Sequence, residues 1–129
     1  MDLDKYLKKG LKNTLLLASG TNFSHGGDWT QVYPNTVLDK WYIGDFSSAE
    51  YTVTLELNKN AKSIVKLLVV ATDNNASVTI YGKSSTVREL VNITAQVNNS
   101  YVEIILNPKT VADTGCFASF AATYFRSHK

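Results

Sequence analysis

The stretch FSSAEYTVTLELN, residues 46–58, decides the fold class of this chain. Apolar side chains stand at every second position from Tyr51 to Leu57, and polar side chains stand between them. Successive side chains of a β-strand point to opposite faces, so this alternation gives one apolar face and one polar face. The segment therefore predicts a strand that is buried on one side and exposed to solvent on the other.

Further strands are predicted along the rest of the chain. Residues 64–71 (IVKLLVVA) are almost continuously apolar and rich in β-branched side chains, which is typical of a central strand covered on both faces. Other β-type runs, separated by turn residues, occupy residues 76–81, 90–97, 101–106 and 117–125. Short strands at regular spacing favour an antiparallel sandwich or barrel. We predict an all-β protein, an antiparallel β-sandwich of about six to seven strands.

The N-terminal residues are patterned differently. Apolar side chains recur there at spacings of three and four, which places them on one face of a helix. The residues on that face are Leu3, Tyr6, Leu7, Leu11 and Leu15. Gly10 weakens such a helix, so a short helix up to Gly10 and a strand over residues 12–18 form the alternative. Either way we expect an N-terminal arm, helical or extended, which packs on its own domain or docks on a neighbouring subunit.

A glycine-rich segment over residues 19–40 predicts a long loop. Four aromatic side chains lie in it or directly after it, namely Trp29, Tyr33, Trp41 and Tyr42. They fit three roles: a flat platform for sugar rings, anchors of a protein interface, or part of the core. We therefore divide the chain into an N-terminal arm and aromatic loop over residues 1–45 and a β-sandwich domain over residues 46–129.

Length and composition exclude several classes of protein. A chain of 129 residues with 44% hydrophobic residues fits one folded domain. The net charge of +2 and the lack of a basic stripe interleaved with aromatics argue against a nucleic-acid partner. No apolar run approaches the roughly 20 residues of a membrane-spanning helix, and the acidic start is unlike a secretory signal. We expect a protein made in a cytoplasm that does not bind membranes.

Few residues offer reactive chemistry. Cys116 precedes an apolar strand and is interpreted as a small buried hydrophobic side chain. Ser24, His25 and Asp28 lie in one glycine-rich segment, which does not hold a nucleophile and its base in fixed geometry. The histidines lack the spacing of metal ligands. We predict no catalytic residues, no metal and no cofactor, and thus a protein that is not an enzyme.

A pair of strand carboxylates was the remaining candidate for catalysis. Glu56 and Glu103 each point away from the apolar face of a predicted strand. If those strands pair, the two carboxylates meet on an exposed sheet. A glycosidase needs two carboxylates at a defined separation across one glycosidic bond, and it also needs them in a cleft. A solvated strand face is the preferred interpretation.

Four segments, in their order along the chain, carry a resemblance to a known family. They are FSSAEYTVTLEL (46–57), SIVKLLVVATDNNASVTIYG (63–82), LVNITAQVNNSYVEIILNP (90–108) and FASFAATYF (117–125). Together they resemble a β-domain of virion structural proteins of tailed bacteriophages, notably T4-like phages of marine cyanobacteria. The resemblance covers about two thirds of the chain and consists of strands, without catalytic residues.

The resemblance implies a protein of the virion that acts by packing, as a tail, neck, baseplate or head-surface component or as a capsid decoration. Its partners would be other virion structural proteins and further copies of itself. The residues expected at the interface are Leu3, Tyr6, Leu7, Leu11, Trp29, Tyr33 and Trp41. The alternative is a carbohydrate-binding module for adhesion to the host surface, in which Trp29 and Trp41 form the platform for a host glycan.

Overall fold

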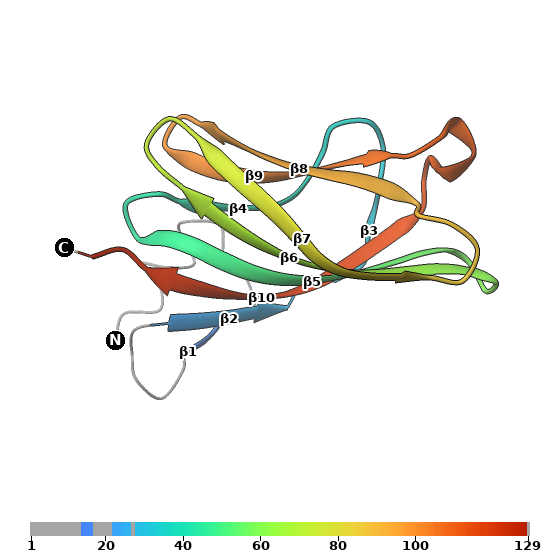
Figure 1. Cartoon of the computed structure of the whole chain (residues 1–129), viewed down its shortest axis with the longest axis horizontal. Helices are drawn as coiled ribbons and strands as arrows, with labels where there is room; N and C mark the ends of the chain where they lie inside the picture. The colour runs from blue at the N-terminus through green and yellow to red at the C-terminus, as the bar shows by residue number, and fades with distance from the viewer. Residues whose placement is uncertain (1–13, 17–21, 27, 129) are drawn as a thin grey trace.

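The protein is a sandwich of two antiparallel β-sheets (Figure 1). A computed structural model describes residues 14–16, 22–26 and 28–128. Sheet A contains, in spatial order, β1 (Thr14–Leu16), β2 (Asn22–Gly26), β10 (Phe117–Arg126), β5 (Phe46–Asn58), β6 (Ala61–Ala71) and β7 (Ala76–Ser85). A two-residue strand, β3 (Thr30–Gln31), also pairs with β10. Sheet B contains β4 (Thr36–Tyr42), β9 (Tyr101–Pro108) and β8 (Val91–Asn98).

The predicted fold class is therefore confirmed. The two sheets lie one above the other (Figure 1), and among the described residues one 3-10 turn, η1 (Val111–Asp113), precedes the last strand. The described residues form ten strands instead of about six to seven. The additional strands are the short ones between Thr14 and Tyr42, in the part of the chain that was expected to be arm and loop.

The stretch that decided the fold forms β5, which lies inside sheet A between β10 and β6. Its alternation is observed as predicted: Tyr51 and Val53 are fully buried, and Leu55 is almost so. The polar residues between them face outward and are partly exposed. Because β5 pairs along nearly its whole length with both neighbours, its inner face forms the middle of the core.

The interpretation of β6 as a strand covered on both faces is wrong for the described residues. Its side chains alternate strictly between buried and exposed. Val65, Leu67 and Val69 face sheet B, whereas Leu68 and Val70 on the opposite face are 45% and 56% exposed. Sheet B covers only one face of sheet A, so the other face of an apolar strand has no layer above it among the described residues.

The prediction of a loop over residues 19–40 is also wrong in part. Residues 36–42 form β4, which pairs with β9 at the edge of sheet B. The register shifts between Val37 and Asp39, so a β-bulge at Leu38 turns both Leu38 and Asp39 toward the core. Trp41 also points inward and is fully buried. The bulge breaks the period of two that reveals a strand in a sequence, which explains why alternation did not identify β4.

Candidate functional site

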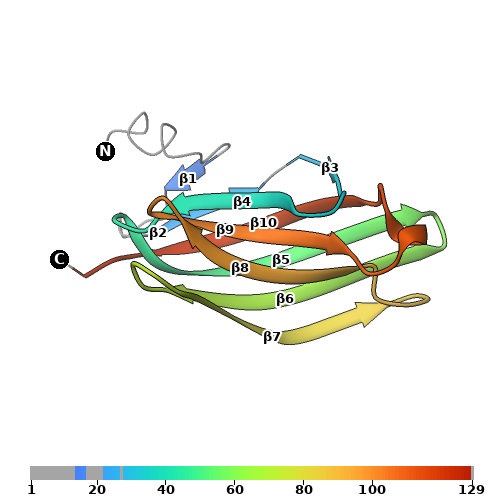
Figure 2. The same cartoon turned by 90° about the horizontal axis from the view of Figure 1, so that it is seen from above.

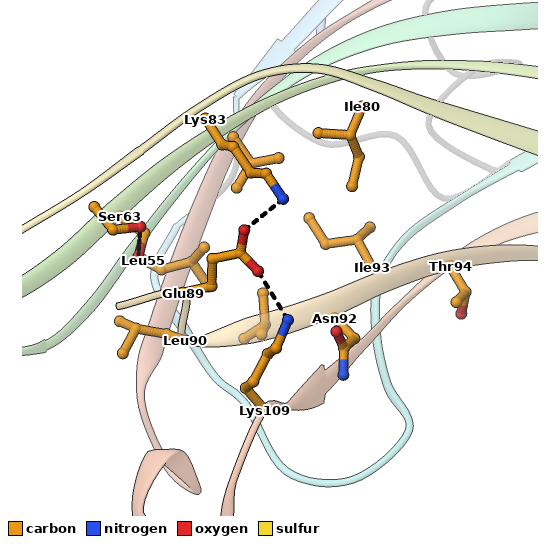
Figure 3. Close-up of a pocket in the computed structure, with 13 residues that line it drawn as sticks. Leu55, Ser63, Ile80, Lys83, Glu89, Leu90, Asn92, Ile93, Thr94 and Lys109 are labelled. Carbon is orange, nitrogen blue, oxygen red and sulfur yellow. Dashed lines mark hydrogen bonds and ion pairs between the residues drawn. The ribbon is translucent and has the colours of Figure 1, made fainter. Parts of the chain in front are cut away.

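A pocket of about 350 Å³ opens between the two sheets, where β7 faces β8 (Figure 3). Its floor is aliphatic and comes from both layers: Leu55 and Val65 from sheet A, and Leu90 and Ile93 from the start of sheet B. All four of these floor residues are also part of the core. Three charged side chains, Lys83, Glu89 and Lys109, stand at the pocket among its polar lining residues.

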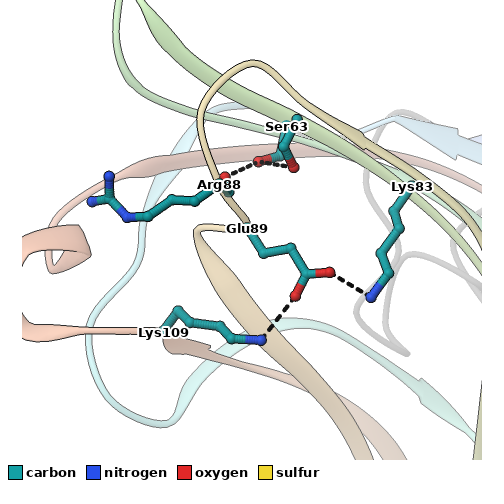
Figure 4. Close-up of polar contacts among 6 residues, drawn as sticks. Ser63, Lys83, Arg88, Glu89 and Lys109 are labelled. Carbon is teal, nitrogen blue, oxygen red and sulfur yellow. Dashed lines mark hydrogen bonds and ion pairs between the residues drawn. The ribbon is translucent and has the colours of Figure 1, made fainter.

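These three side chains form a chain of ion pairs that joins the sheets (Figure 4). Lys83 on β7 pairs with one carboxylate oxygen of Glu89, and Lys109 Nζ, just after β9, lies 2.8 Å from the other oxygen. The hydrogen bonds from Lys109 and Lys83, reinforced by their charges, lower the pKa of Glu89 to about 2. Glu89 is thus a fixed anion at neutral pH and does not serve as a general acid.

The loop that crosses from β7 to β8 is held at several further points. Ser63 Oγ donates to the backbone oxygen of Arg88 at 3.3 Å, and the Arg88 guanidinium pairs with Asp113. Asp113 is fully buried and also accepts a 3.0 Å hydrogen bond from Thr110 Oγ1. A buried carboxylate needs such partners, since an uncompensated charge in the interior is costly. The loop beside the pocket is therefore a fixed wall.

The arrangement fits the binding of an apolar group beside a carboxylate or another anion. Two ammonium groups against one carboxylate leave one net positive charge at the pocket mouth. Within the described ranges, no cluster of three or more His, Cys, Asp or Glu side chains has the geometry of a metal site. The sequence does not reveal this pocket, because Lys83, Glu89 and Lys109 match no motif and meet only through the sheet topology.

A second polar cluster lies deep in the core. The hydroxyl groups of Tyr51 and Tyr124 both donate to Asp39 Oδ2, at 2.7 Å and 2.6 Å. Trp41 Nε1 in turn donates to the Tyr51 hydroxyl at 2.9 Å. Burial raises the pKa of Asp39 to about 6, although the hydrogen bonds from Tyr124 and Tyr51 oppose that shift. Its enclosure between the sheets indicates a structural role, because a substrate has no access to it.

The outer face of sheet A, which looks away from sheet B, carries a third candidate surface. Leu68, Val70 and Phe125 are 45%, 56% and 38% exposed and lie around a shallow hollow of about 340 Å³. We call these three residues the outer patch. On the same face Tyr81 lies beside Glu50; desolvation and this carboxylate, to which the Tyr81 hydroxyl hydrogen-bonds, raise the pKa of Tyr81.

The structure places the predicted interface residues in different environments. Trp41 is in the core and has no exposed surface to offer a partner. Trp29 and Tyr33 are about half exposed, at 50% and 49%. The four arm residues lie outside the described ranges; they are Leu3, Tyr6, Leu7 and Leu11. The expected platform of Trp29 and Trp41 is not formed, because a buried indole presents no face to a sugar.

The other chemical candidates are also placed. Cys116 is fully buried, as predicted, and burial raises the pKa of its thiol. Glu56 lies on β5 in sheet A and Glu103 on β9 in sheet B, so the two carboxylates do not share a sheet. The side chains of Ser24 and His25 are outside the described part of the structure. Among the described residues no helix has the length and apolarity needed to cross a bilayer.

Comparison with known proteins gives likeness in structure only. Neither a protein-family model nor a curated protein matches the chain. Similar solved structures are the tailspike of Acinetobacter baumannii phage AM24 (TM-score 0.47, 10% identity) and the tailspike of Acinetobacter phage vB_ApiP_P1 (TM-score 0.44, 12% identity). They match 81% and 90% of this chain, which spans 27% and 24% of those tailspikes.

A third similar structure bears on the expectation that this chain is not an enzyme. It is a tailspike of Acinetobacter baumannii bacteriophage Fri1, described as a capsular polysaccharide depolymerase. The TM-score is 0.47 at 10% identity, and the match covers 88% of this chain and 19% of that tailspike. Since a similar structure occurs in an enzyme, the exclusion of enzymatic activity was wrong. The depolymerase activity is a property described for the Fri1 protein.

Proposed function

We propose that this chain is a structural component of a bacteriophage virion, associated with the tail, which acts by packing against other virion proteins in several copies. The observation that carries the proposal is the outer patch of sheet A. Strands buried on both faces have nearly continuous apolar sequences. The sequence of β6 has this character, yet among the described residues only one of its faces is covered.

The exposed apolar groups on this face extend beyond one strand. Leu68 and Val70 belong to β6, and Phe125 belongs to β10, two strands away across β5. Contiguous apolar surface that remains exposed on a soluble domain marks a site of protein contact. The order of the four segments along the chain, which resembles a β-domain of phage virion proteins, supports the same function, because such domains act by packing.

The partners in this proposal are other virion proteins and further copies of the chain. The N-terminal segment with Leu3, Tyr6, Leu7 and Leu11 supplies additional apolar contacts, as do the exposed rings of Trp29 and Tyr33. Each contact is modest on its own. Repetition on a symmetric particle raises the overall strength of binding, because each further contact forms at a high effective concentration. The mature protein is then located in the virion.

The test is incorporation of a Val70→Lys variant into phage particles. A lysine at this position places a charge in the middle of the outer patch, and burying it against a partner is unfavourable. We expect the variant to fold with wild-type stability and to be lost from particles, as measured by immunoblotting of purified virions.

The matched control is Val111→Lys, which makes the same substitution at a 92% exposed valine in η1. This variant should enter particles as the wild type does. If Val70→Lys is incorporated as well as Val111→Lys, the outer patch is not a packing surface and the proposal fails.

A further inference from the structure

Strand β7 forms one border of sheet A, and no strand lies beyond it in the described structure (Figure 2). It is a long edge of 10 residues, whereas β1 at the opposite border has 3. An exposed edge strand presents backbone N–H and C=O groups that pair readily with another strand. Proteins usually protect such an edge with charges, proline, a bulge or a covering segment.

The two halves of β7 differ in this protection. The second half contains a β-bulge, where the register with β6 shifts opposite Lys66 and Leu67, and it carries Lys83. Residues 76–80 (ASVTI) have neither a charge nor a proline, and they pair with β6 in unbroken register. The unprotected part of the edge is therefore this uncharged run, with Val78 at its centre.

The hydrogen-bond pattern shows which backbone groups face the open edge. At the turn between β6 and β7, the Thr72 N–H donates to the Asn75 oxygen at 2.8 Å. Bonded and non-bonded pairs alternate in an antiparallel ladder. The Thr72–Asn75 pair is hydrogen-bonded, so every second pair after it is hydrogen-bonded too. Ser77 and Thr79 therefore bond to β6 through their backbone groups. The backbone groups of the residues between and beside them point away from β6; these residues are Ala76, Val78 and Ile80.

The other long edges of the sandwich belong to sheet B. In sheet B, β4 is interrupted by the bulge at Leu38 and carries Lys40. The first half of β8 lines the pocket between the sheets, with Ile80 and Lys83 of β7 also at that pocket. β8 carries neither a charge nor a bulge, so residues 76–80 of β7 are one of two long, regular, uncharged edge runs among the strands that the structure describes, and they are the one in the larger sheet.

We propose that two copies of this chain pair through β7, antiparallel about a two-fold axis at Val78. The axis brings Val78 opposite Val78 of the second copy and Ala76 opposite its Ile80. Each such pair exchanges two backbone hydrogen bonds, because all of these residues have their N–H and C=O directed outward. A strand paired with itself in this way satisfies the rule that a two-fold interface uses the same surface on both copies.

The pairing also explains the position of the outer patch. Leu68 and Val70 pair with Thr79 and Ser77, so they lie one strand from the edge. In the dimer the two β6 strands are three strand spacings apart, about 14 Å, and their outer faces are continuous. The inference thus rests on the proposed assembly, and it names the contact through which the first two copies combine into one wider apolar surface.

The test is the Val78→Pro variant of the full chain, compared with Val78→Thr. Proline removes the outward N–H and places its ring at the edge, and edge positions with the N–H facing solvent tolerate it. Threonine keeps the N–H and the β-branched shape. Dimer dissociation constants are measured by sedimentation equilibrium, with circular dichroism to verify folding. We expect Val78→Pro to weaken the dimer at least about tenfold and Val78→Thr to change it less than about threefold.

A second variant keeps the test decisive if the proline variant does not fold. In the proposed dimer the two Val78 Cα atoms are about 5.5 Å apart, within the range of a disulfide. Val78→Cys should give a disulfide-linked dimer under mild oxidation, since the native Cys116 is buried. Val87→Cys, at a 64% exposed loop position, is the control and should remain monomeric on a denaturing gel.

Two results overturn the inference. One is a dimer that Val78→Pro does not weaken; the other is no faster crosslinking of Val78→Cys than of Val87→Cys. Neither result decides the proposed function. A chain that is monomeric in solution and still enters virions, but not with Val70→Lys, packs through the outer patch without pairing at β7.

Discussion

Leu67 and Leu68 are consecutive, identical residues on β6, and they have opposite environments. Leu67 is fully buried against sheet B, whereas Leu68 is 45% exposed on the outer face. Val69 and Val70 repeat the contrast at 2% and 56% exposed. The difference shows that apolar composition marks a face that is suited to burial, while the layers present decide which face is buried in the single chain. Around Leu68 and Val70 the outer face of sheet A is apolar, and no layer lies above it among the described residues.

The largest expected effect is the difference in unfolding free energy between alanine substitutions at these two leucines. Leu67→Ala removes buried methylene and methyl groups and leaves a cavity, which costs about 2–5 kcal/mol of unfolding free energy. Leu68→Ala removes exposed atoms and should change the unfolding free energy by less than about 1 kcal/mol. Urea titration of both variants measures the difference. Equal losses would show that the outer face is already covered in the isolated chain.

The buried carboxyl group of Asp39 gives a second contrast between the interior and the surface, in the pH dependence of stability. The pKa of Asp39 is raised in the folded protein, from an ordinary 3.8 to about 6, so folding favours its protonated form. Its contribution to stability is fully present below about pH 4 and is lost as the pH rises through about 6, a change of about 3 kcal/mol. Above that range its contribution is constant.

The Asp39→Asn variant checks this assignment. Asparagine stays neutral, so the part of the pH dependence between about pH 4 and 6 should disappear. Urea unfolding of the wild type and the variant at closely spaced pH values measures it. If the two proteins show parallel pH profiles, the titration of Asp39 is not the cause.

The smallest effect is expected at an exposed carboxylate. Lys109→Ala removes the hydrogen bond and charge that contribute most to lowering the pKa of Glu89, so this pKa should rise toward its ordinary value. Stability should fall only slightly, and the difference should vanish at high salt, because exposed ion pairs are screened. Titration of Glu89 by NMR in the two proteins measures the pKa. An unchanged value would mean that the ion pairs beside the pocket do not persist in solution.

Side-chain alternation predicted the later strands of the sandwich well. The runs that became β5 and β8 have a clear period of two, and the apolar residues that alternation selected do face the core. The short strands β2 and β3 were missed, because a strand of five or two residues among glycines has too few positions to show a period. The sequence did not decide whether Trp41 belongs to an interface or to the core. The bulge at Leu38 interrupts the alternation of apolar and polar residues in β4, so the strand could not be recognised.

The candidate surfaces were harder to predict than the fold. The pocket depends on Lys83, Glu89 and Lys109, which come from a strand, a loop and the end of another strand. Nothing in their spacing along the chain indicates that they meet. For β6, the sequence did show two apolar faces, but local sequence does not show which layers lie above and below the strand. That information depends on the assembly and lies outside any single strand.

The hydrogen bond between Tyr124 and Asp39 has a consequence for the order of folding. It joins residues 85 positions apart in the sequence, and β10, which carries Tyr124, lies between β2 and β5. Contacts so distant along the chain form slowly, because a long loop must close before they contribute. During synthesis, β2 and β5 must wait for β10 with their facing edges open. A ribosome-bound chain that ends before Phe117 should therefore require protection by chaperones, because sheet A closes only after β10 has been synthesised.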